Sequence, residues 1–418
     1  MTTLDAIQRL QFSDRQAAEA MLLGFMRSEL SLNAVRVDLR PLAVSLNSFN
    51  GFVTLEDGTR LFFKTHTESD TIIAEYYNAG QLAEAGYPVL QPIHSSTESG
   101  RQLLIYPVVD EPSVFDVAWA IEQGEAGALA ALTSAQQATD DRLMEIYAAT
   151  LAPQNAADAA SAPVHQLFHH RLAGGRLERF YGPLPGVAGN GPGIQLPDGT
   201  HSMREIRQVR WTINGQVYDD TLDDLIQRAL VMLEPAQHGP SIIGHGDAHN
   251  GNLFFLREDQ PPSLLYFDPA FAGRHHPLLD LAKPLFHNVF AMWMYHAQEK
   301  ASALTLTVRK ADDRWVITHD YTLPPVRTMF WTSKVERVLL PALALLKRNG
   351  LLREDWRAFL KAALFCCPLL TINLADRGKF PPVISLLGLC MAIEMGSESR
   401  GEHSPLDRTL DEAERALR

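Results

Sequence analysis

The segment at residues 242–254, IIGHGDAHNGNLF, places side chains capable of chemistry between two apolar flanks. It contains two histidines, one aspartate and two asparagines, separated by glycines that favour turns. An aspartate fixed in such a loop can accept a proton from a substrate hydroxyl. Asp247 is therefore the first candidate for a catalytic residue.

A second candidate, Asp268, follows the apolar segment SLLYF at 263–267. We expect strands at 253–256 and 263–267 to form a hairpin, since the turn-forming sequence REDQPP separates them. This hairpin would bring Asp268 near Asn252, and the two would converge with Asp247. Oxygen ligands of this kind suit Mg²⁺, which is usually shared with phosphate oxygens. The pattern of a base, a metal site and little covalent chemistry is typical of phosphoryl transfer.

The elements that must position these residues differ along the chain. Residues 35–109 predict the order β-β-β-α-β-β, because strand-like segments rich in β-branched and aromatic residues flank a helix at 72–85. Residues 1–34 predict an N-terminal helical extension. The sequence therefore divides into 1–34, a sheet domain at 35–110 and a mainly helical domain at 111–418 that carries β-hairpin insertions. The fold class is α+β.

Composition narrows the class of protein. The chain has 418 residues, 46% of them hydrophobic, and a net charge of −12, which argues against nucleic acid or an anionic membrane as a partner. The longest apolar runs, Val338–Leu346 and Ala362–Ile372, are shorter than the roughly 18 residues that a membrane span requires. The three cysteines form no disulfide framework, and the first residues carry no secretory apolar segment. We expect a cytoplasmic protein with reduced thiols.

The motif His245-Gly246-Asp247 followed by Asn252 resembles the HGDxxxxN catalytic loop of the aminoglycoside phosphotransferase and choline kinase-like family. Phe267-Asp268-Pro269 and the downstream Asp280-Leu281-Ala282 resemble the second metal-binding aspartate and the DLA element of that family. The resemblance implies a bilobal protein-kinase-like fold, with a small β lobe, a hinge and a large helical lobe. The predicted order of elements at 35–109 agrees with the small lobe.

The resemblance also implies a role for each matched residue. Asp247 would be the catalytic base, and Asn252 with Asp268 would hold Mg²⁺. Lys64, on the third predicted strand, would contact the nucleotide phosphates, and Glu75 on the following helix would pair with it.

Nucleotide contacts are expected from two further segments. The turn at 47–51 contains no GxGxxG motif, so Ser48 and backbone amides would cover the phosphates. The segment around Tyr106 and Val108 occupies the hinge, where backbone groups would meet the base of ATP or GTP.

Several neighbouring side chains receive structural interpretations. His245 is expected to hold the loop by packing and hydrogen bonding, and Asp280 to accept hydrogen bonds beneath it. For His249 we favour a structural or phosphate-side contact. His275 and His276 resemble a metal pair, but adjacent histidines rarely both bind one ion, so we favour a surface or substrate-loop role.

The acceptor is expected to bind between the catalytic loop and insertions at 165–220 and 290–330. These insertions mix aromatic residues with arginines, which suits a sugar or an anionic acceptor, although core aromatics and solvated arginines fit the same pattern. The residues are Trp211, Tyr218, Trp293, Tyr295, Trp315, Tyr321, Arg171, Arg176, Arg204 and Arg207. Asp219, Asp220, Asp223 and Asp224 could instead form an acidic wall for an aminoglycoside, or begin a helix.

The sequence thus predicts an ATP- or GTP-dependent kinase that transfers the γ-phosphate to a hydroxyl of a small molecule such as a sugar, an amino alcohol or an antibiotic. Two alternatives stay open. One is a catalytically silent kinase fold that binds nucleotide in a regulatory role. The other is a metal-dependent phosphoesterase, because the segment 246–249 also resembles a fragment of binuclear metallophosphoesterases.

Overall fold

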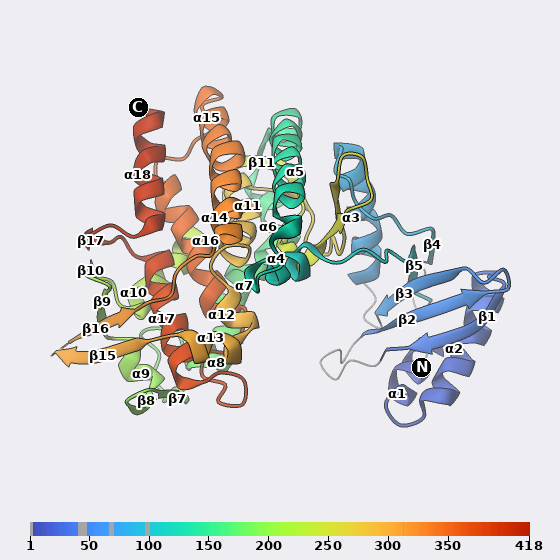
Figure 1. The fold of residues 1–418 in the computed structure, drawn as a ribbon, viewed down its shortest axis with the longest axis horizontal. Coiled ribbons are helices and arrows are strands. Elements are labelled where there is room, and N and C mark those ends of the chain that lie inside the picture. Colours follow the sequence, from blue (N-terminus) through green and yellow to red (C-terminus); the bar gives the residue numbers. More distant parts are fainter. Residues whose placement is uncertain (1–2, 41–47, 67–70, 97–100, 312) are drawn as a thin grey trace. The chain divides into compact units, whose positions relative to one another are not determined.

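The computed structural model describes residues 3–40, 48–66, 71–96, 101–311 and 313–418. Two compact units make up the chain, and Figure 1 labels their helices and strands. The sheet unit comprises Met1–Pro112 together with Leu265–Ala272. The helical unit comprises Ser113–Leu264 and Gly273–Arg418. The segment that carries Asp268 therefore belongs to the sheet unit, whereas the loop that carries Asp247 belongs to the helical unit.

The sheet unit is built on a five-stranded antiparallel sheet in the order β1-β2-β3-β5-β4. The strands are β1 (Ala34–Leu39), β2 (Ser48–Leu55), β3 (Arg60–His66), β4 (His94–Ser96) and β5 (Leu103–Pro107). The helix α3 (Thr71–Ala85) connects β3 to β4. This order of elements confirms the sequence prediction for residues 35–109. The sequence VLQPI at 89–93 also predicts a strand, but this prediction is wrong in position, because the fourth strand lies at His94–Ser96.

Two N-terminal helices, α1 (Thr3–Leu10) and α2 (Arg15–Glu29), share one core with this sheet. The side chain of Asp14 caps α2 by accepting a hydrogen bond from the backbone N–H of Ala17. Buried residues of both helices and of four strands form a single apolar cluster, which includes Leu4, Ile7, Leu22, Met26, Val37, Phe49, Phe63 and Ile105. The helices therefore stabilise the sheet by burying its apolar face.

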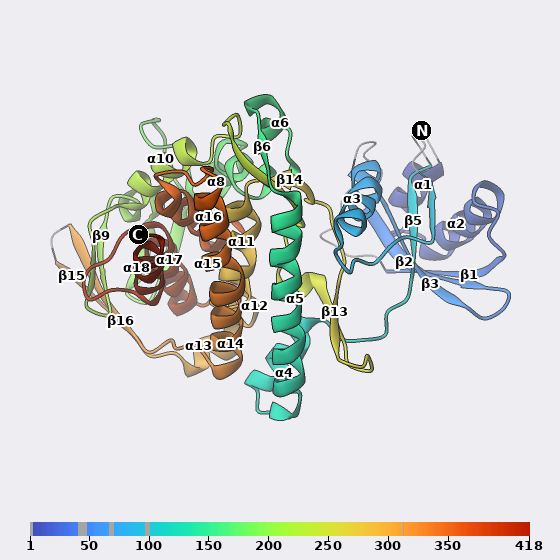
Figure 2. The same cartoon turned by 90° about the horizontal axis from the view of Figure 1, so that it is seen from above.

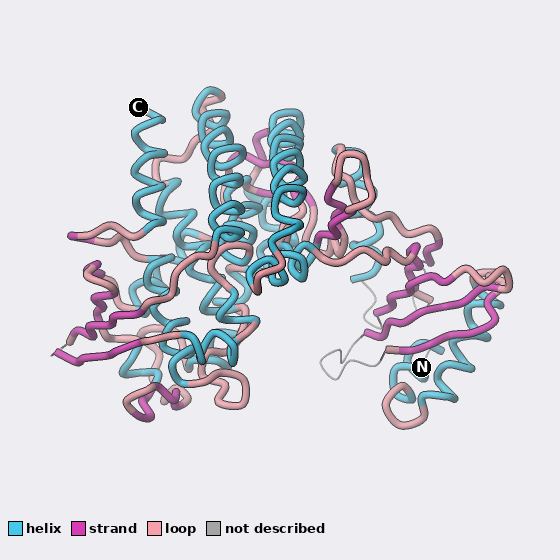
Figure 3. Tube along the Cα trace, in the orientation of Figure 1, coloured by secondary structure: helices cyan, strands magenta, loops and turns pink. Residues whose placement is uncertain are grey.

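Most of the helical unit consists of packed helices, drawn in cyan in Figure 3. They are α4 (Val114–Glu122), α5 (Leu129–Thr150), α6 (Ala156–Ala160), α7 (His169–Ala173), α8 (Arg176–Tyr181), α9 (Met203–Ile206), α10 (Leu222–Met232), α11 (Pro277–His287), α12 (Met292–Tyr295), α13 (Ala297–Ala303), α14 (Pro325–Lys334), α15 (Leu340–Arg348), α16 (Trp356–Leu370), α17 (Pro382–Gly396) and α18 (Pro405–Leu417). Figure 2 shows α5 beside α14 and α15. The helices α16 and α17 pack together and are almost wholly buried, as their apolar sequences require.

Short sheets and hairpins complete the helical unit. A three-stranded sheet in the order β14-β11-β6 is formed by β6 (Ala152–Gln154), β11 (Gly239–Gly244) and β14 (Gly273–His275). The sequence predicts hairpins in VRWTINGQVYD, with its Asn-Gly turn, and in the segment 305–321. Both join one five-stranded sheet in the order β15-β16-β9-β10-β17. Its strands are β9 (Arg210–Ile213), β10 (Gln216–Tyr218), β15 (Leu306–Ala311), β16 (Arg314–His319) and β17 (Arg400–Gly401).

Two further strand pairs are β7 (Gly193–Leu196) with β8 (Gly199–Ser202), and β12 (Leu253–Leu256) with β13 (Ser263–Tyr266). The second pair confirms the predicted hairpin that precedes Asp268. The α+β class, with a small antiparallel sheet unit and a larger, mainly helical unit, is also confirmed. Among the described residues, no helix is long and apolar enough to cross a membrane.

Candidate active site

The loop that follows β11 holds Asp247 through its backbone. The carbonyl oxygen of Asp247 accepts hydrogen bonds from the N–H of His249 at 2.8 Å and from Nδ2 of Asn252 at 2.9 Å. The loop ends in the short 3₁₀ helix Asn250–Asn252, and the Asp247 side chain is 15% exposed. Its Oδ1 atom accepts no hydrogen bond from any described residue. The loop thus fixes the carboxylate and leaves its buried Oδ1 atom without a hydrogen-bond donor among the described residues.

Asp280, at the first turn of α11, supports this loop from below. Its Oδ1 accepts hydrogen bonds from the N–H of Gly246 at 2.6 Å and from Nε2 of His275 at 3.0 Å, and its Oδ2 accepts one from the hydroxyl of Tyr147. Burial raises the pKa of Asp280, but these hydrogen bonds outweigh burial and hold the pKa below its ordinary value. The predicted structural role of Asp280 is confirmed.

Two glycines allow the loop to approach this carboxylate. A Cβ atom at Gly244 would lie 2.6 Å from both Oδ1 of Asp280 and Nε2 of His275. Gly246 has a φ of 77°, a left-handed conformation that favours glycine. The spacing of glycines in the motif therefore has a local steric cause.

Lys283 lies one turn further along α11 and faces Asp247. Its Nζ is 3.8 Å from Oδ1 of Asp247, and its side chain is only 4% exposed. Burial lowers the pKa of Lys283, and the charge of Asp247 opposes part of that effect. Lys283 therefore places a buried cation beside the carboxylate of Asp247.

A short hydrogen-bonded chain continues from Lys283 towards the surface. Nε2 of His287 is 3.3 Å from Nζ of Lys283, and Nδ1 of His287 is 2.8 Å from the hydroxyl of Tyr295. Burial, followed by the charge of Lys283, lowers the pKa of His287 well below its ordinary value. His287 is therefore neutral, and its Nε2 can accept a hydrogen bond from the ammonium group of Lys283. This chain fixes the direction of the lysine.

In the sheet unit, Lys64 on β3 forms an ion pair with Asp268. Nζ of Lys64 is 3.0 Å from Oδ1 of Asp268, and the two side chains are 22% and 44% exposed. Asp268 has a φ of 54°, which is unusual for a residue other than glycine. Nδ2 of Asn78, on α3, donates to the carbonyl of Pro269 at 3.2 Å. The predicted phosphate-binding lysine and the predicted metal-binding aspartate thus meet in the structure.

The other predicted nucleotide contacts also lie in the sheet unit. Ser48 begins β2 and Glu75 lies in α3, and the side chains of both are outside the described residues. Tyr106 lies near the end of β5 and is 6% exposed, and Val108 follows the last residue of that strand. The strand β5 is paired with β3, so the segment around Tyr106 lies next to the strand that carries Lys64.

Most of the aromatic residues considered for acceptor binding form core instead. Trp211, Tyr218 and Trp293 are 0% exposed, and Trp315 is 6% exposed and packs against Trp211 with ring centroids 5.7 Å apart. The hydroxyl of Tyr321 donates to the carbonyl of Phe290 at 3.0 Å. Only Tyr295 is joined by hydrogen bonds to the group around Lys283.

The four aspartates of a possible acidic wall are already paired. Asp219 forms ion pairs with Arg314 at 3.0 Å and Arg400 at 2.7 Å, and Asp220 pairs with Arg228 at 2.7 Å. Asp223 pairs with Arg207, and Asp224 closes the capping box of α10 with Thr221. The charges of Asp219, Asp220 and Asp223 are therefore balanced by arginines, and Asp224 serves the helix cap.

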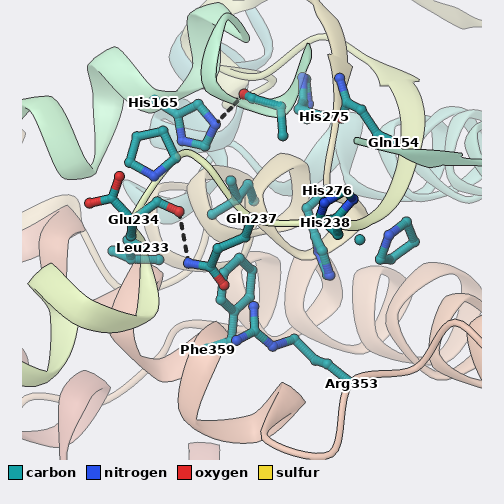
Figure 4. Close-up of a pocket in the computed structure, with 15 residues that line it drawn as sticks. Gln154, His165, Leu233, Glu234, Gln237, His238, His275, His276, Arg353 and Phe359 are labelled. Atoms are coloured by element: carbon teal, nitrogen blue, oxygen red, sulfur yellow. Dashed lines mark hydrogen bonds between the residues drawn. The ribbon is translucent and has the colours of Figure 1, made fainter. Parts of the chain in front are cut away.

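His275 and His276 contribute to a pocket of the helical unit, shown in Figure 4 with His165 and Arg353. His275 is 1% exposed and is bonded to Asp280, so the surface or substrate-loop interpretation of this residue is wrong. Burial lowers the pKa of His165 to about 4 and that of His276 to about 3, which keeps both imidazoles neutral. Nδ1 of His276 accepts a hydrogen bond from the N–H of Leu278 and caps α11. Both adjacent histidines therefore support the helix that carries Asp280 and Lys283.

Sequence reasoning missed Lys283, His287 and Tyr147. Lys283 follows the Asp280-Leu281-Ala282 element directly, and a lysine within an apolar helix was the signal that could have singled it out. Tyr147 lies 133 residues before Asp280 in the chain, so no local pattern connects the two.

A model of the phosphotransferase enzyme family matches residues 38–309 of this chain. The match covers more than half of the sequence and includes Lys64, Asp247, Asn252 and Asp268. The chain belongs to this family. No curated protein matches the chain closely enough to count as a relative.

Solved structures of small-molecule kinases show distant similarity. The amicoumacin kinase hAmiN in complex with AMP-PNP, Ca²⁺ and Ami is 14% identical, covers 93% of this chain and 94% of its own, and has a TM-score of 0.47. Macrolide 2'-phosphotransferase MphH from Brachybacterium faecium is 15% identical, with coverages of 82% and 97% and a TM-score of 0.33. A thermostable mutant of aminoglycoside phosphotransferase APH(4)-Ia with ADP and hygromycin B is 11% identical, with coverages of 82% and 96% and a TM-score of 0.38.

Proposed function

We propose that this protein transfers the γ-phosphate of ATP or GTP to a hydroxyl of a small molecule. The observation that carries the proposal is the state of Asp247: its backbone is fixed by the loop, and Oδ1 accepts no hydrogen bond from the described residues. Membership of the phosphotransferase enzyme family supplies the reaction class. In this reaction Asp247 orients the acceptor hydroxyl and takes its proton as the new P–O bond forms.

Asn252 and Asp268 are the residues that would hold Mg²⁺. Their amide and carboxylate oxygens are hard donors, and Asp268 already attracts a cation, since Nζ of Lys64 lies 3.0 Å from it. The described residues contain no group of three or more His, Cys, Asp or Glu arranged to hold a metal ion. Two protein oxygens are compatible with an ion that completes its coordination with phosphate and water. When bound, the ion would neutralise charge on the phosphates.

The nucleotide would lie along β2, β3 and β5 of the sheet unit. Lys64 contacts the phosphates as a point charge, with Glu75 as its partner on α3. Ser48 and nearby backbone amides cover the phosphates, and the backbone around Tyr106 and Val108 meets the base. The pairing of β3 with β5 supports this arrangement, because it places the phosphate-binding and base-binding segments on adjacent strands.

The alternatives are less well supported. The family match favours phosphoryl transfer over a metal-dependent phosphoesterase, whose further motifs the sequence lacks. A silent nucleotide-binding protein has no need for a carboxylate held beside a buried lysine, as Asp247 is held beside Lys283.

The test measures thermal unfolding with ATP or GTP, with and without Mg²⁺, followed by phosphate transfer to an acceptor panel detected by ³¹P NMR. A nucleotide that binds the native state raises the unfolding midpoint by mass action. We expect a Mg²⁺-dependent rise with at least one nucleotide, and loss of most of it in Asp268→Asn. Arg36→Met, which removes an exposed ion pair on the same sheet, is the matched control and should respond like the wild type.

Either of two results would overturn the proposal. One is the absence of a midpoint shift with both nucleotides. The other is nucleotide binding without transfer to any acceptor and without slow hydrolysis by water, which would leave the silent fold as the better explanation.

A further inference from the structure

The side of Asp247 that Lys283 occupies carries more positive than negative charge. Arg171 on α7 and Arg176 on α8 act electrostatically on Lys283, together with Asp247. Asp247 is the carboxylate with the strongest effect on both Arg171 and Lys283. Within the described residues, neither arginine forms an ion pair with a carboxylate. Lys283 and Arg171 therefore share Asp247 as their main counter-charge, and Arg176 adds a further positive charge near Lys283.

The guanidinium of Arg171 is the least satisfied of these groups. Its Nη1 atom is buried and makes no hydrogen bond with a described residue. Burial lowers the pKa of Arg171, and the charge of Asp247 offsets only part of that decrease. Arg176, by comparison, donates to the carbonyl of Leu370 at 3.3 Å and lies over the ring of Phe180. A buried charged donor without a partner is unfavourable unless another group supplies the acceptor.

The helices that carry these groups are firmly packed, so the charges cannot move apart. Helix α16 packs against both α7 and α11. The charges of Arg171 and Lys283 act on the thiols of its Cys366 and Cys367. Lys283 is fixed further by His287 and Tyr295. Tyr295 is 38% exposed, which places one end of this group at the surface. The cluster is thus rigid and cationic, and its Tyr295 end lies at the surface.

We infer that the acceptor carries an oxyanion of its own, a carboxylate or a phosphate, which Arg171 and Lys283 bind while Asp247 receives the proton of the neighbouring hydroxyl. This inference rests on the proposed function and names the acceptor class. A guanidinium and an ammonium together match the charge and hydrogen-bonding capacity of a carboxylate or phosphate. A cationic antibiotic is disfavoured, because the three cations would repel it and because Asp219, Asp220 and Asp223 are already paired with arginines.

The experiment compares acceptor probes that differ mainly in charge. The pairs are D-gluconate with D-glucitol, D-glycerate with glycerol, and D-glucose 6-phosphate with D-glucose. Each is tested at millimolar concentration for its effect on the unfolding midpoint without nucleotide, and as an acceptor with Mg²⁺ and ATP. We expect at least one anionic probe to bind, and to bind more tightly than its neutral partner. A charge-assisted hydrogen bond predicts a difference of about 10–100-fold.

Arg171→Met keeps an unbranched side chain and removes the charge. We expect it to abolish the preference for the anionic probe and raise the KM of that acceptor about 10–100-fold, while the midpoint shift caused by Mg²⁺-nucleotide is kept. Arg171→Lys should restore part of the preference. The matched control is Arg179→Met, which removes an exposed arginine from α8 and should leave the preference unchanged.

Three outcomes would overturn the inference: no anionic probe binds, the neutral partners bind as well, or the preference survives in Arg171→Met. Loss of the nucleotide shift in Arg171→Met with unchanged acceptor preference would also overturn it, because the arginine would then serve the transferred phosphate. Failure of the proposed function looks different. In that case the anionic probe binds wild type and not Arg171→Met, but neither ATP nor GTP binds or is consumed.

Discussion

The lysine–aspartate pairs Lys64–Asp268 and Lys283–Asp247 differ in burial and in distance. Lys64 and Asp268, in the sheet unit, are 3.0 Å apart with side chains 22% and 44% exposed. Lys283 and Asp247, in the helical unit, are 3.8 Å apart with side chains 4% and 15% exposed. The exposed pair is thus in direct contact, whereas the buried pair stands beyond hydrogen-bonding distance.

This difference separates two tasks. An exposed ion pair contributes little to stability, since water screens it and can replace either partner. Lys64 can therefore leave Asp268 to bind phosphate, and Asp268 can leave Lys64 to bind the metal, at a small free-energy cost. A buried pair resists rearrangement, because each charge would be left without a partner. Lys283 and Asp247 are suited to a fixed task, such as holding a base aimed at one atom.

The strongest test of this distinction is Asp247→Asn. The amide keeps the shape of the side chain but cannot accept the hydroxyl proton, so we expect phosphate transfer to fall about 10²–10⁴-fold. Nucleotide binding, assigned to the other pair, should be nearly unchanged. Steady-state kinetics and the nucleotide-induced shift in unfolding midpoint measure the two effects separately.

Asp141→Asn serves as the control for this variant, because it removes an exposed carboxylate paired with Arg337 in the same unit. It should keep wild-type transfer. If Asp247→Asn transferred phosphate at the wild-type rate, Asp247 would not be the base. The buried pair would then have no separate catalytic task.

The second test concerns the carboxylate beneath the loop. Asp280→Ala leaves the N–H of Gly246, His275 and the hydroxyl of Tyr147 without their shared acceptor. Loss of one partner from a buried charged network predicts a decrease of about 3–5 kcal/mol in the free energy of unfolding. Tyr147→Phe removes a single hydrogen bond and should cost about 1 kcal/mol. Urea unfolding of both variants decides whether the loop is held by Asp280 or by packing alone.

Local patterns were enough to predict much of the fold and part of the site. The β-branched segments place the strands, and Gly86, which follows the predicted helix at 72–85, places the end of α3, because such signals act within a few residues. The hairpin before Asp268 follows from two apolar segments around a polar turn. Asp280 beneath the loop was likewise predicted from its motif.

What the sequence could not supply depends on distant partners. Whether Trp211 is core or acceptor wall depends on a sheet built from strands about a hundred residues apart, β9 and β16. The aspartates at 219–224 look like a free acidic patch until Arg314 and Arg400 are brought beside them. The N-terminal helices likewise share a core with strands that only the tertiary structure brings together.

The third test uses pH to probe burial beneath the loop. Burial lowers the pKa of His276 to about 3. As the pH falls below the ordinary histidine pKa near 6.5, His276 binds a proton in the unfolded chain but not in the native protein. The free energy of unfolding therefore decreases by about 2 kcal/mol by about pH 5. In His276→Asn, which keeps a helix-capping side chain, this part of the decrease should vanish. Equal slopes of unfolding free energy against pH in variant and wild type would show that His276 is solvated.

The smallest effect on stability is expected where the comparison began, at Lys64. Lys64→Met removes an exposed ion pair, so the free energy of unfolding should change by less than about 1 kcal/mol. Its effect on nucleotide affinity should be larger, about 10–100-fold, because a charge-assisted contact to phosphate is lost. Urea unfolding and nucleotide titration of the same preparation give both numbers. A large stability loss with unchanged nucleotide affinity would contradict the assignment of Lys64 and Asp268 to nucleotide binding. The ion pair would then stabilise the fold and would not give way to phosphate and metal.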